Sequence, residues 1–263
     1  HGMHGWQWLF IIEGIPSVLA GIVAYFYMTD RPEQAKWLSD SERAIVKQQL
    51  ELDEKAQGKR DSDWRTMFTN PMVWLLIAVF FCLLCANSTL TFWMPTVIRE
   101  AGFTSPMEVG WIAGAAYLLG AAGMIINGRH SDKRGEVRWH FAGSALLGAV
   151  GMLALAITMG MESIPVLAAL TVMVLALVGT MSAIPVFWQM PNMLLSGGAA
   201  AVGVALINSV ANLAGFGAPY LMGLIKASTG KVAPGLYLVA IVEALAAILA
   251  IAFIARIQRR KSA

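Results

Sequence analysis

Seven long runs of apolar residues without a single lysine or arginine constrain this chain more than any other feature. Each run is long enough to cross a membrane, since about 20 helical residues span the hydrocarbon core. The runs lack the alternation of polar and apolar residues that membrane strands need, so helices are predicted. We therefore expect an all-α, polytopic membrane protein with about seven transmembrane helices, at residues 6–28, 72–94, 109–127, 141–160, 164–190, 199–225 and 235–255.

The composition and the positions of the charges support the same interpretation. Apolar types make up 57% of the chain and charged types only 13%, whereas ordinary soluble proteins carry about 25% charged residues. The nineteen Lys and Arg residues gather mainly in 30–70, 128–140 and the tail from 256. With seven spans these segments share one side, which the positive-inside rule makes cytoplasmic. The basic residues therefore indicate topology, with a cytoplasmic C-terminus, and no nucleic-acid partner is expected.

The beginning of the chain and its first long loop suggest how it divides. It starts at His1, with an outward-facing stub before the first span, and we expect a fragment that has lost its beginning. In the loop, Ser39 and Glu42 have the spacing of a capping box, and an amphipathic helix is predicted to follow. The expected divisions are a first helix at 1–28, a cytoplasmic linker at 29–71, and a six-helix bundle with its basic tail at 72–263.

The sequence predicts no enzyme, metal site or cofactor. His1, His4, His130 and His140 are expected in loops without the spacing of metal ligands, and the CxxC pair Cys82 and Cys85 is expected to serve packing. Two acids, Glu13 and Glu243, lie inside spans, where a charged carboxylate exposed to lipid costs at least about 2.5 kcal/mol. Each is either a proton carrier or a structural, hydrogen-bonded group, and both interpretations stay open.

Several motifs resemble those of one transporter family. Residues 128–135 match the loop pattern G-x-x-x-D-[RK]-x-G of the major facilitator superfamily. The stretches 5–16, 30–38, 92–96, 187–191 and 201–212 are similar to its anion:cation symporter branch, in the same order. The resemblance implies helices six to twelve of a twelve-helix fold. The preceding half would then hold most proton-coupling carboxylates and the cation that binds substrate. It also implies a cytoplasmic gating motif made of Gly128, Asp132, Lys133, Arg134 and Gly135.

The function implied by this resemblance is secondary active transport in the cell inner membrane. An organic carboxylate would move together with protons by alternating access, with the lipid bilayer and the preceding half as the chain's partners. Tartrate-like, sugar-acid and aromatic-acid carriers look alike at this level, so the carboxylate stays open. The rival interpretation is a membrane sensor or scaffold that uses the same fold without transporting anything.

Neutral polar residues are the candidate substrate ligands of this half. Asn208 and Asn212 share one helical face and either line the central cavity or hydrogen-bond to another helix. The resemblance favours substrate contact for Asn208 and leaves Asn212 undecided. Trp188 and Gln189 follow Pro185, which removes a backbone hydrogen bond, although Trp188 also suits an interfacial anchor. Asn87 is a weaker candidate of the same kind.

Overall fold

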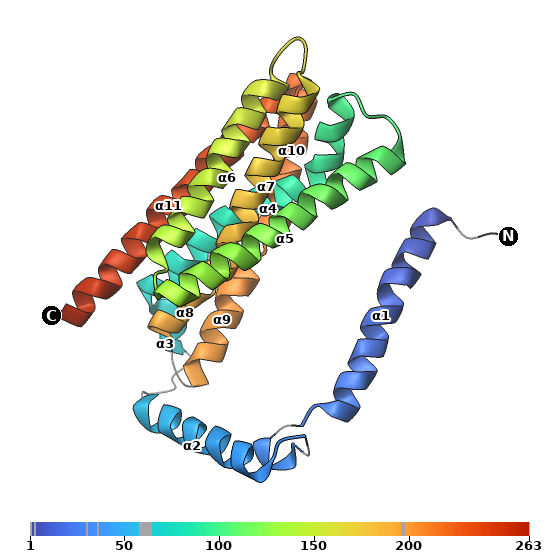
Figure 1. The fold of residues 1–263 in the computed structure, drawn as a ribbon. Coiled ribbons are helices and arrows are strands. Elements are labelled where there is room, and N and C mark those ends of the chain that lie inside the picture. The colour runs from blue at the N-terminus through green and yellow to red at the C-terminus, as the bar shows by residue number, and fades with distance from the viewer. Residues whose placement is uncertain are drawn as a thin grey trace. The chain divides into compact units, whose positions relative to one another are not determined.

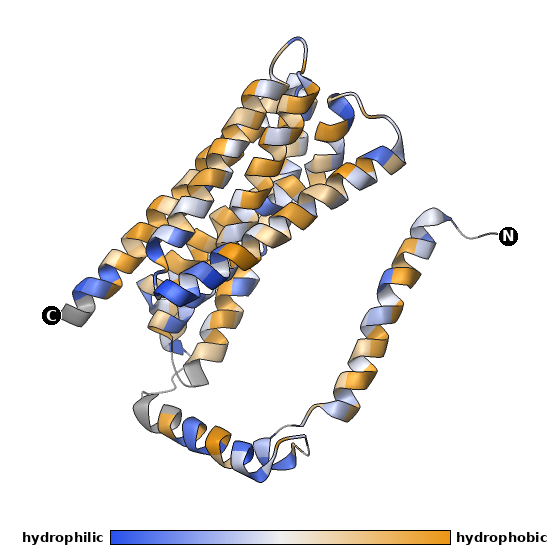
Figure 2. Ribbon diagram, in the orientation of Figure 1, coloured by the Kyte–Doolittle hydropathy of each residue, from blue (hydrophilic) through white to orange (hydrophobic). Residues whose placement is uncertain are grey.

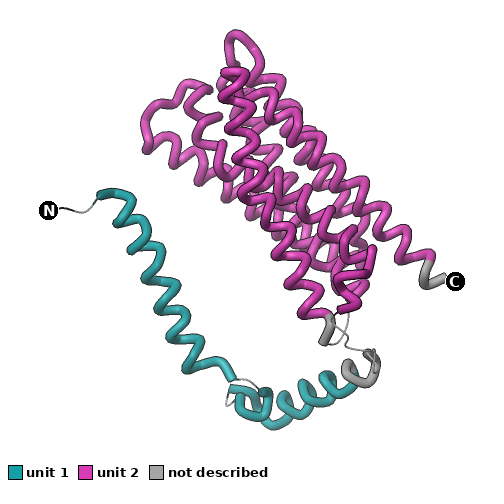
Figure 3. Tube along the Cα trace, turned by 180° about the vertical axis from the view of Figure 1, so that it is seen from behind, with its two compact units in different colours: residues 1–60 teal, residues 61–263 magenta. Residues whose placement is uncertain are grey.

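The computed structural model describes the chain apart from residues 1, 3, 30, 36, 58–64, 196–197 and 263, and apart from the side chains of 53–57, 198–199 and 260–262. Two compact units follow one another, residues 1–60 and residues 61–263 (Figure 3). Every regular element in the described part is a helix, as the apolar runs predict. The expected division at residues 28 and 71 stays a prediction.

The first unit contains a membrane-length helix and a surface helix. Helix α1 spans Gly5–Tyr27, a 3-10 turn η1 spans Pro32–Gln34, and α2 spans Asp40–Gln57. The predicted capping box of α2 is confirmed, since Ser39 N–H donates to Glu42 Oε2 at 2.9 Å and Glu42 N–H donates to Ser39 Oγ at 3.3 Å. The Ser39 hydroxyl, which donates to Glu42 Oε2 at 2.7 Å, and then Ser39 N–H hold the pKa of Glu42 below its ordinary value. α2 therefore begins where the sequence places its N-cap.

The second unit is a bundle of long helices with short connections (Figure 1). Its elements are α3 (Arg65–Thr69), α4 (Pro71–Glu100), α5 (Pro106–Arg134), α6 (Arg138–Met159), α7 (Val166–Phe187), α8 (Gln189–Leu194), α9 (Gly198–Ala211), α10 (Ala214–Thr229) and α11 (Ala233–Ser262). α7 with α8, and α9 with α10, each form one membrane-length segment, so the described chain holds seven candidate spans. All seven predicted spans are confirmed.

The core of the bundle lies where α6, α7 and α11 meet and where α4 meets α10 and α11. Glycines bring α6 and α7 into backbone contact. A Cβ built on Gly179 would lie 2.6 Å from Cα of Gly148, and one built on Gly151 would lie 2.7 Å from Cα of Ala176. Small residues commonly allow membrane helices to approach in this way, because lipid supplies no hydrophobic drive for association. Figure 2 shows apolar residues along most of the length of these helices.

The connections place the basic segments of the second unit together. The α5–α6 turn, α3, α8 and the end of α11 lie at one end of the bundle, and the α4–α5, α6–α7 and α10–α11 connections lie at the other (Figure 1). Two expectations for the first of these ends are wrong. α5 continues through the motif to Arg134 and α6 begins at Arg138, so His130 and His140 are helical rather than in a loop. Charged residues prolong both helices beyond their apolar runs.

Candidate functional site

The span formed by α9 and α10 is interrupted at Asn212 and Leu213, beside the predicted asparagine pair. Asn212 Nδ2 donates to the backbone carbonyl of Asn208 at 2.8 Å and to Asn208 Oδ1 at 2.9 Å. Both asparagines are exposed on the surface of this chain. The acceptor oxygen of Asn208 is thus occupied, and its Nδ2 group has no partner among the described residues. Asn208 therefore presents two N–H donors that have no partner in the described part of the chain, beside the break in this span.

Helix α4 places further polar groups opposite this interruption. Ser88 Oγ lies 3.8 Å from the position that a Cβ on Gly215 would take, just after the break. Next to it, Asn87 is half-buried, and its carbonyl accepts from Thr91 Oγ1 at 2.9 Å. The hydroxyl of Tyr117 on α5 donates to Thr91 Oγ1 at 3.1 Å. A polar strip thus runs from the break in α9 and α10, across α4, to α5.

Trp188 and Gln189 lie at the junction of α7 and α8, shortly after Pro185, and their side chains point to different neighbours. Trp188 ends α7 and packs edge-on against Phe80 and Phe187, with ring centroids 5.1 and 5.4 Å away. Phe80 precedes Asn87 by about two helical turns on α4. Gln189 points to a different neighbour, since its Nε2 donates to Asp132 Oδ1 at 2.9 Å. Gln189 therefore joins the predicted gating motif rather than the asparagine pair.

The motif itself forms the last turns of α5. Gly135 ends the helix in the left-handed region, with φ of 59°, which favours glycine because a Cβ would be strained there. Ser131, at the buried side, donates to the carbonyl of Glu136 at 2.8 Å. Gly128 packs beside Pro185 of α7, at an ordinary van der Waals distance for a Cβ. Lys133 and Arg134 are exposed, whereas the Asp132 carboxylate, with a longer contact of 3.5 Å between Ser131 Oγ and Gln189 Oε1, ties the motif to α8.

The hydrogen-bonded turn after the motif perturbs one carboxylate. Burial raises the pKa of Glu136, but Trp139 N–H, at 2.8 Å, and the ring and N–H of His140 outweigh that effect and lower it below its ordinary value. The ring of His140 lies 2.6 Å from Glu136 Oε2. Glu136 thereby caps the start of α6.

Glu243 lies in the core of the bundle, fully buried between α6, α7 and α11. Its Oε1 is 2.6 Å from Thr180 Oγ1, which is also 2.8 Å from the carbonyl oxygen of Ala176. Its Oε2 is buried and has no partner in the described part of the chain. Gly148 makes room for the group, because a Cβ there would lie 2.8 Å from the Glu243 carboxyl carbon. Glu13, the other intramembrane acid, is exposed on α1 in the first unit.

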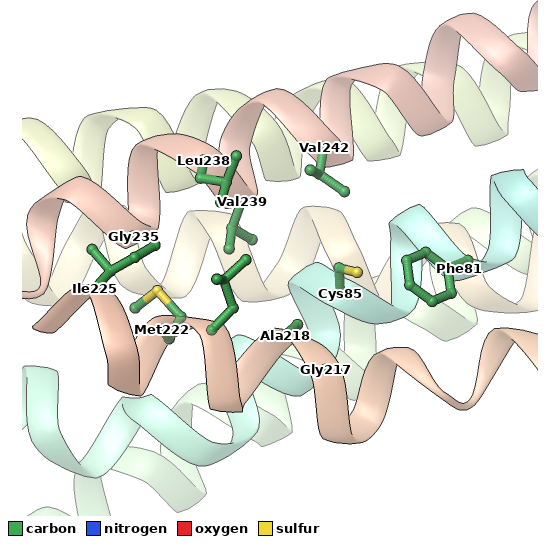
Figure 4. Close-up of a pocket in the computed structure, with 11 residues that line it drawn as sticks. Phe81, Cys85, Gly217, Ala218, Met222, Ile225, Gly235, Leu238, Val239 and Val242 are labelled. Carbon is green, nitrogen blue, oxygen red and sulfur yellow. The ribbon is translucent and has the colours of Figure 1, made fainter. Parts of the chain in front are cut away.

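The best-enclosed cavity lies away from all of these groups. A cavity of about 380 Å³ between α4, α10 and α11 is lined by apolar side chains such as Phe81, Met222 and Leu238, with Cys85 on its wall (Figure 4). It offers neither a cation nor an N–H donor from a side chain, so it does not suit a carboxylate. Cys82 and Cys85 are buried free thiols. The described residues hold no metal-ligand cluster.

Sequence reasoning missed three polar residues that the structure places at these sites: Tyr117, Ser131 and Thr180. Each is an uncharged polar residue in or at the end of an apolar span. That signal marks a group in need of a hydrogen-bond partner, but it does not say which helix supplies the partner. Ser131 could be identified from the sequence, because it lies inside the motif, between Gly128 and Asp132.

Comparison with known proteins agrees with the geometry. The family model of the Major Facilitator Superfamily matches residues 2–219. A protein of Agrobacterium vitis named "Putative tartrate transporter" is 42% identical over 91% of this chain and 54% of its own length. The "Putative metabolite transport protein NicT" of Pseudomonas putida is 36% identical over 98% and 58%, and the "Quinolone resistance transporter" of Acinetobacter baumannii is 34% identical over 99% and 59%.

The chain therefore spans between half and three fifths of the length of these curated relatives. All of them are named as transporters, and neither they nor the family are enzymes. The family model covers most of the chain, and the helical architecture is the one that its apolar runs require. By these findings, the chain is a multi-pass membrane protein that belongs to the Major Facilitator Superfamily.

Proposed function

We propose that this chain forms the substrate-contacting C-terminal half of a proton-coupled symporter for an organic carboxylate in the cell inner membrane. The relatives named as tartrate transporters support a carboxylate, and the basic residues at one end of the bundle support a cytoplasmic C-terminus. The exposed asparagine pair is the observation that carries the proposal. An unpaired amide is unfavourable against lipid, so this face borders water, substrate or another polar surface.

The orientation of the pair favours an anionic ligand. Because Asn212 donates to Oδ1 of Asn208, the Asn208 amide turns its two N–H groups outward. Such donors suit a carboxylate oxygen, and the seven apolar runs of this chain contain no Lys or Arg that could bind it instead. Asn208 would then bind substrate directly and Asn212 would orient it. Asn87 and Trp188 would border the same cavity from α4 and α7.

The other predicted residues complete a transport cycle in this proposal. Asp132, held by Gln189, would fix the end of α5 against α8 in the cytoplasmic gate, while Lys133 meets the preceding half. Gly128 and Gly135 would set the packing and the end of that helix. Glu13 and Glu243 are the candidate proton carriers within the spans of this chain. The family resemblance assigns further proton-coupling carboxylates to the preceding half.

The test uses a transporter of full family length that contains this chain. Asn208→Asp keeps the shape of the side chain but replaces both N–H donors by an acceptor oxygen. A hydrogen bond to a charged group contributes about 1.5–3 kcal/mol, so carboxylate affinity should fall roughly 10- to 150-fold. The measurement is the thermal shift of the purified protein over a panel of tartrate, sugar acids and aromatic acids, followed by uptake into proteoliposomes.

Ser209→Ala is the matched control, because it removes a neighbouring exposed polar group from the same helix. It should leave carboxylate affinity within about twofold. If Asn208→Asp lowers the melting temperature without ligand and binds carboxylates normally, the pair is interhelical glue and the site assignment is wrong. If the unaltered protein neither binds nor transports any carboxylate, the sensor or scaffold interpretation replaces transport.

A further inference from the structure

A polar pocket of about 290 Å³ opens between the ends of α5 and α6, outside the groups assigned to substrate. Its walls come from Asn127, His130 and Arg134 of α5 and from Trp139, His140 and Gly143 of α6. Asn127, His130 and Arg134 are three and four residues apart, and Gly143 follows His140 by three and Trp139 by four, so the two helices turn these residues toward the pocket. Beside Gly143 no atom lies within 4 Å of where a Cβ would be, so the pocket is open there.

The floor of this pocket is fixed by hydrogen bonds. Asn127 Nδ2 donates to the carbonyl oxygens of Ser182 at 2.8 Å and of His140 at 3.4 Å, which ties α5 to α7 and α6. His140 Nδ1 lies 2.6 Å from Glu136, and its Nε2 lies 2.7 Å from His130 Nδ1. Both rings are thereby held in place against the pocket.

Arg134 supplies the permanent charge. Its side chain is exposed, lines the pocket, and has no hydrogen-bond or ion-pair partner in the described part of the chain. By contrast Glu136, the carboxylate beside the pocket, is occupied by His140 and Trp139 N–H. A planar guanidinium beside fixed imidazoles can donate two parallel hydrogen bonds to two oxygens of a tetrahedral phosphate group. The pocket therefore favours an anion.

The surroundings indicate an anion that carries acyl chains. Trp139 is 62% exposed, and Arg138 makes a cation–π contact with it, 4.8 Å from the ring centroid. Tryptophan is enriched at the level of lipid headgroups. One helical turn toward the membrane centre, on the same faces, Ile126 and Leu147 are 69% and 40% exposed. The acyl chains of a lipid whose headgroup lies in the pocket would thus meet exposed apolar side chains.

We propose that this pocket between α5 and α6 binds the phosphate headgroup of an anionic phospholipid from the cytoplasmic leaflet, with Arg134 as its principal ligand and Trp139 at its rim. Basic pockets between membrane helices on that side commonly hold such headgroups. A bound lipid would bridge the ends of α5 and α6 next to Asp132, and so stabilise the end of the bundle that carries the motif. This proposal does not depend on which substrate is transported.

The experiment measures lipid binding to the detergent-solubilised chain by native mass spectrometry and by thermal shift. The probes are phosphatidylglycerol, phosphatidylcholine and free glycerol phosphate. Phosphatidylglycerol should bind and raise the melting temperature, whereas the other two should not, since one lacks net negative charge and the other lacks acyl chains. Arg134→Gln should weaken phosphatidylglycerol binding roughly 10- to 100-fold, because a charge-assisted contact is lost.

Two further variants distinguish specific binding in the pocket from nonspecific electrostatic attraction of anionic lipid to the protein surface. Lys133→Gln removes the same charge from an exposed neighbour that does not line the pocket, and should change affinity less than about threefold, since exposed charges interact weakly. Gly143→Leu fills the open side of the pocket without altering charge, and should abolish binding without lowering the lipid-free melting temperature. Equal losses in Arg134→Gln and Lys133→Gln would overturn the proposal, and so would equal binding of glycerol phosphate or full binding by Gly143→Leu.

Discussion

Gly179 provides the sharpest test of the packing in the bundle. A Cβ at this position would lie 2.6 Å from Cα of Gly148 and 2.8 Å from the carbonyl carbon of Leu147, whereas carbon atoms pack at about 3.5–4.0 Å. These neighbours are backbone atoms, so the added methyl group cannot be accommodated by a rotamer change. Gly179→Ala must therefore push α6 and α7 apart by roughly 1 Å, which forfeits a quarter to a half of the dispersion energy at the contact.

The free-energy cost of this clash can be obtained from a matched pair of variants, Gly179→Ala and Gly114→Ala. Overpacking of a well-packed core costs about 1–3 kcal/mol. Replacing glycine by alanine within a helix also contributes about 1 kcal/mol of helix propensity. Gly114→Ala on α5 gains the same propensity without the clash, because no atom lies within 4 Å of its Cβ position. The difference between the two variants isolates the clash at about 1–3 kcal/mol.

Thermal unfolding of the detergent-solubilised chain measures this difference. At about 2–4 °C per kcal/mol for a chain of this size, Gly179→Ala should melt roughly 2–12 °C below Gly114→Ala. Gly148→Ala should behave like Gly179→Ala, since its Cβ would meet the amide nitrogen of Thr180 at 2.9 Å. If Gly179→Ala and Gly114→Ala melt at the same temperature, α6 and α7 do not cross at these glycines.

Two other predictions concern topology and pH. In a cysteine-free background, Glu33→Cys and Thr104→Cys should be labelled by impermeant thiol reagents from opposite sides of the membrane, and labelling from one side would refute the charge-based orientation. Because its hydrogen bonds lower the pKa of Glu136, this carboxylate should contribute stability above its unfolded-state pKa and lose that contribution as the pH falls through its folded-state pKa. The free energy of unfolding of the unaltered chain should therefore exceed that of Glu136→Gln near neutral pH and approach it in acid. A difference that does not change with pH would contradict this assignment.

The sequence predicts the spans well because hydrophobicity and length are local properties. Each of the seven apolar runs corresponds to a helix, and the capping box at Ser39 and Glu42 marks the start of α2. Local patterns fail where charged residues continue a helix beyond the hydrocarbon core. His130 and His140 were expected in a loop for that reason, although the left-handed end of α5 at Gly135 follows from the motif's second glycine.

Contacts between distant residues lie beyond such local patterns. Gln189 is 57 positions from Asp132, and Thr180 is 63 positions from Glu243, so no periodicity relates either pair. The helix break expected at Pro185 put Gln189, which follows it, among the candidate substrate ligands. The short α8 instead turns its amide toward the end of α5. Which polar residue of a span meets which partner depends on helix rotation and crossing, and these are set by side-chain packing across the whole bundle.

The buried carboxyl group of Glu243 illustrates how hydrogen-bond geometry narrows an ambiguity in the sequence. Thr180 Oγ1 lies within hydrogen-bond distance of both Glu243 Oε1 and the carbonyl oxygen of Ala176, yet a hydroxyl group carries one proton. Both contacts are satisfied when Thr180 donates to Ala176 and a protonated Glu243 donates to Thr180. Glutamine can make the same donation with its N–H group, and it carries no charge.

We therefore expect Glu243→Gln to fold with nearly unchanged stability. Thr180→Val, which leaves the carboxyl donor unpaired, should lower the free energy of unfolding by about 1–3 kcal/mol. A charged carboxylate predicts the opposite order, because glutamine would then remove a buried charge that costs several kcal/mol and would raise the melting temperature clearly. In a transporter of full length, proton-driven uptake that survives Glu243→Gln assigns Glu243 to helix packing. Uptake that loses its dependence on the proton gradient, in a variant of unchanged stability, assigns it to proton carriage.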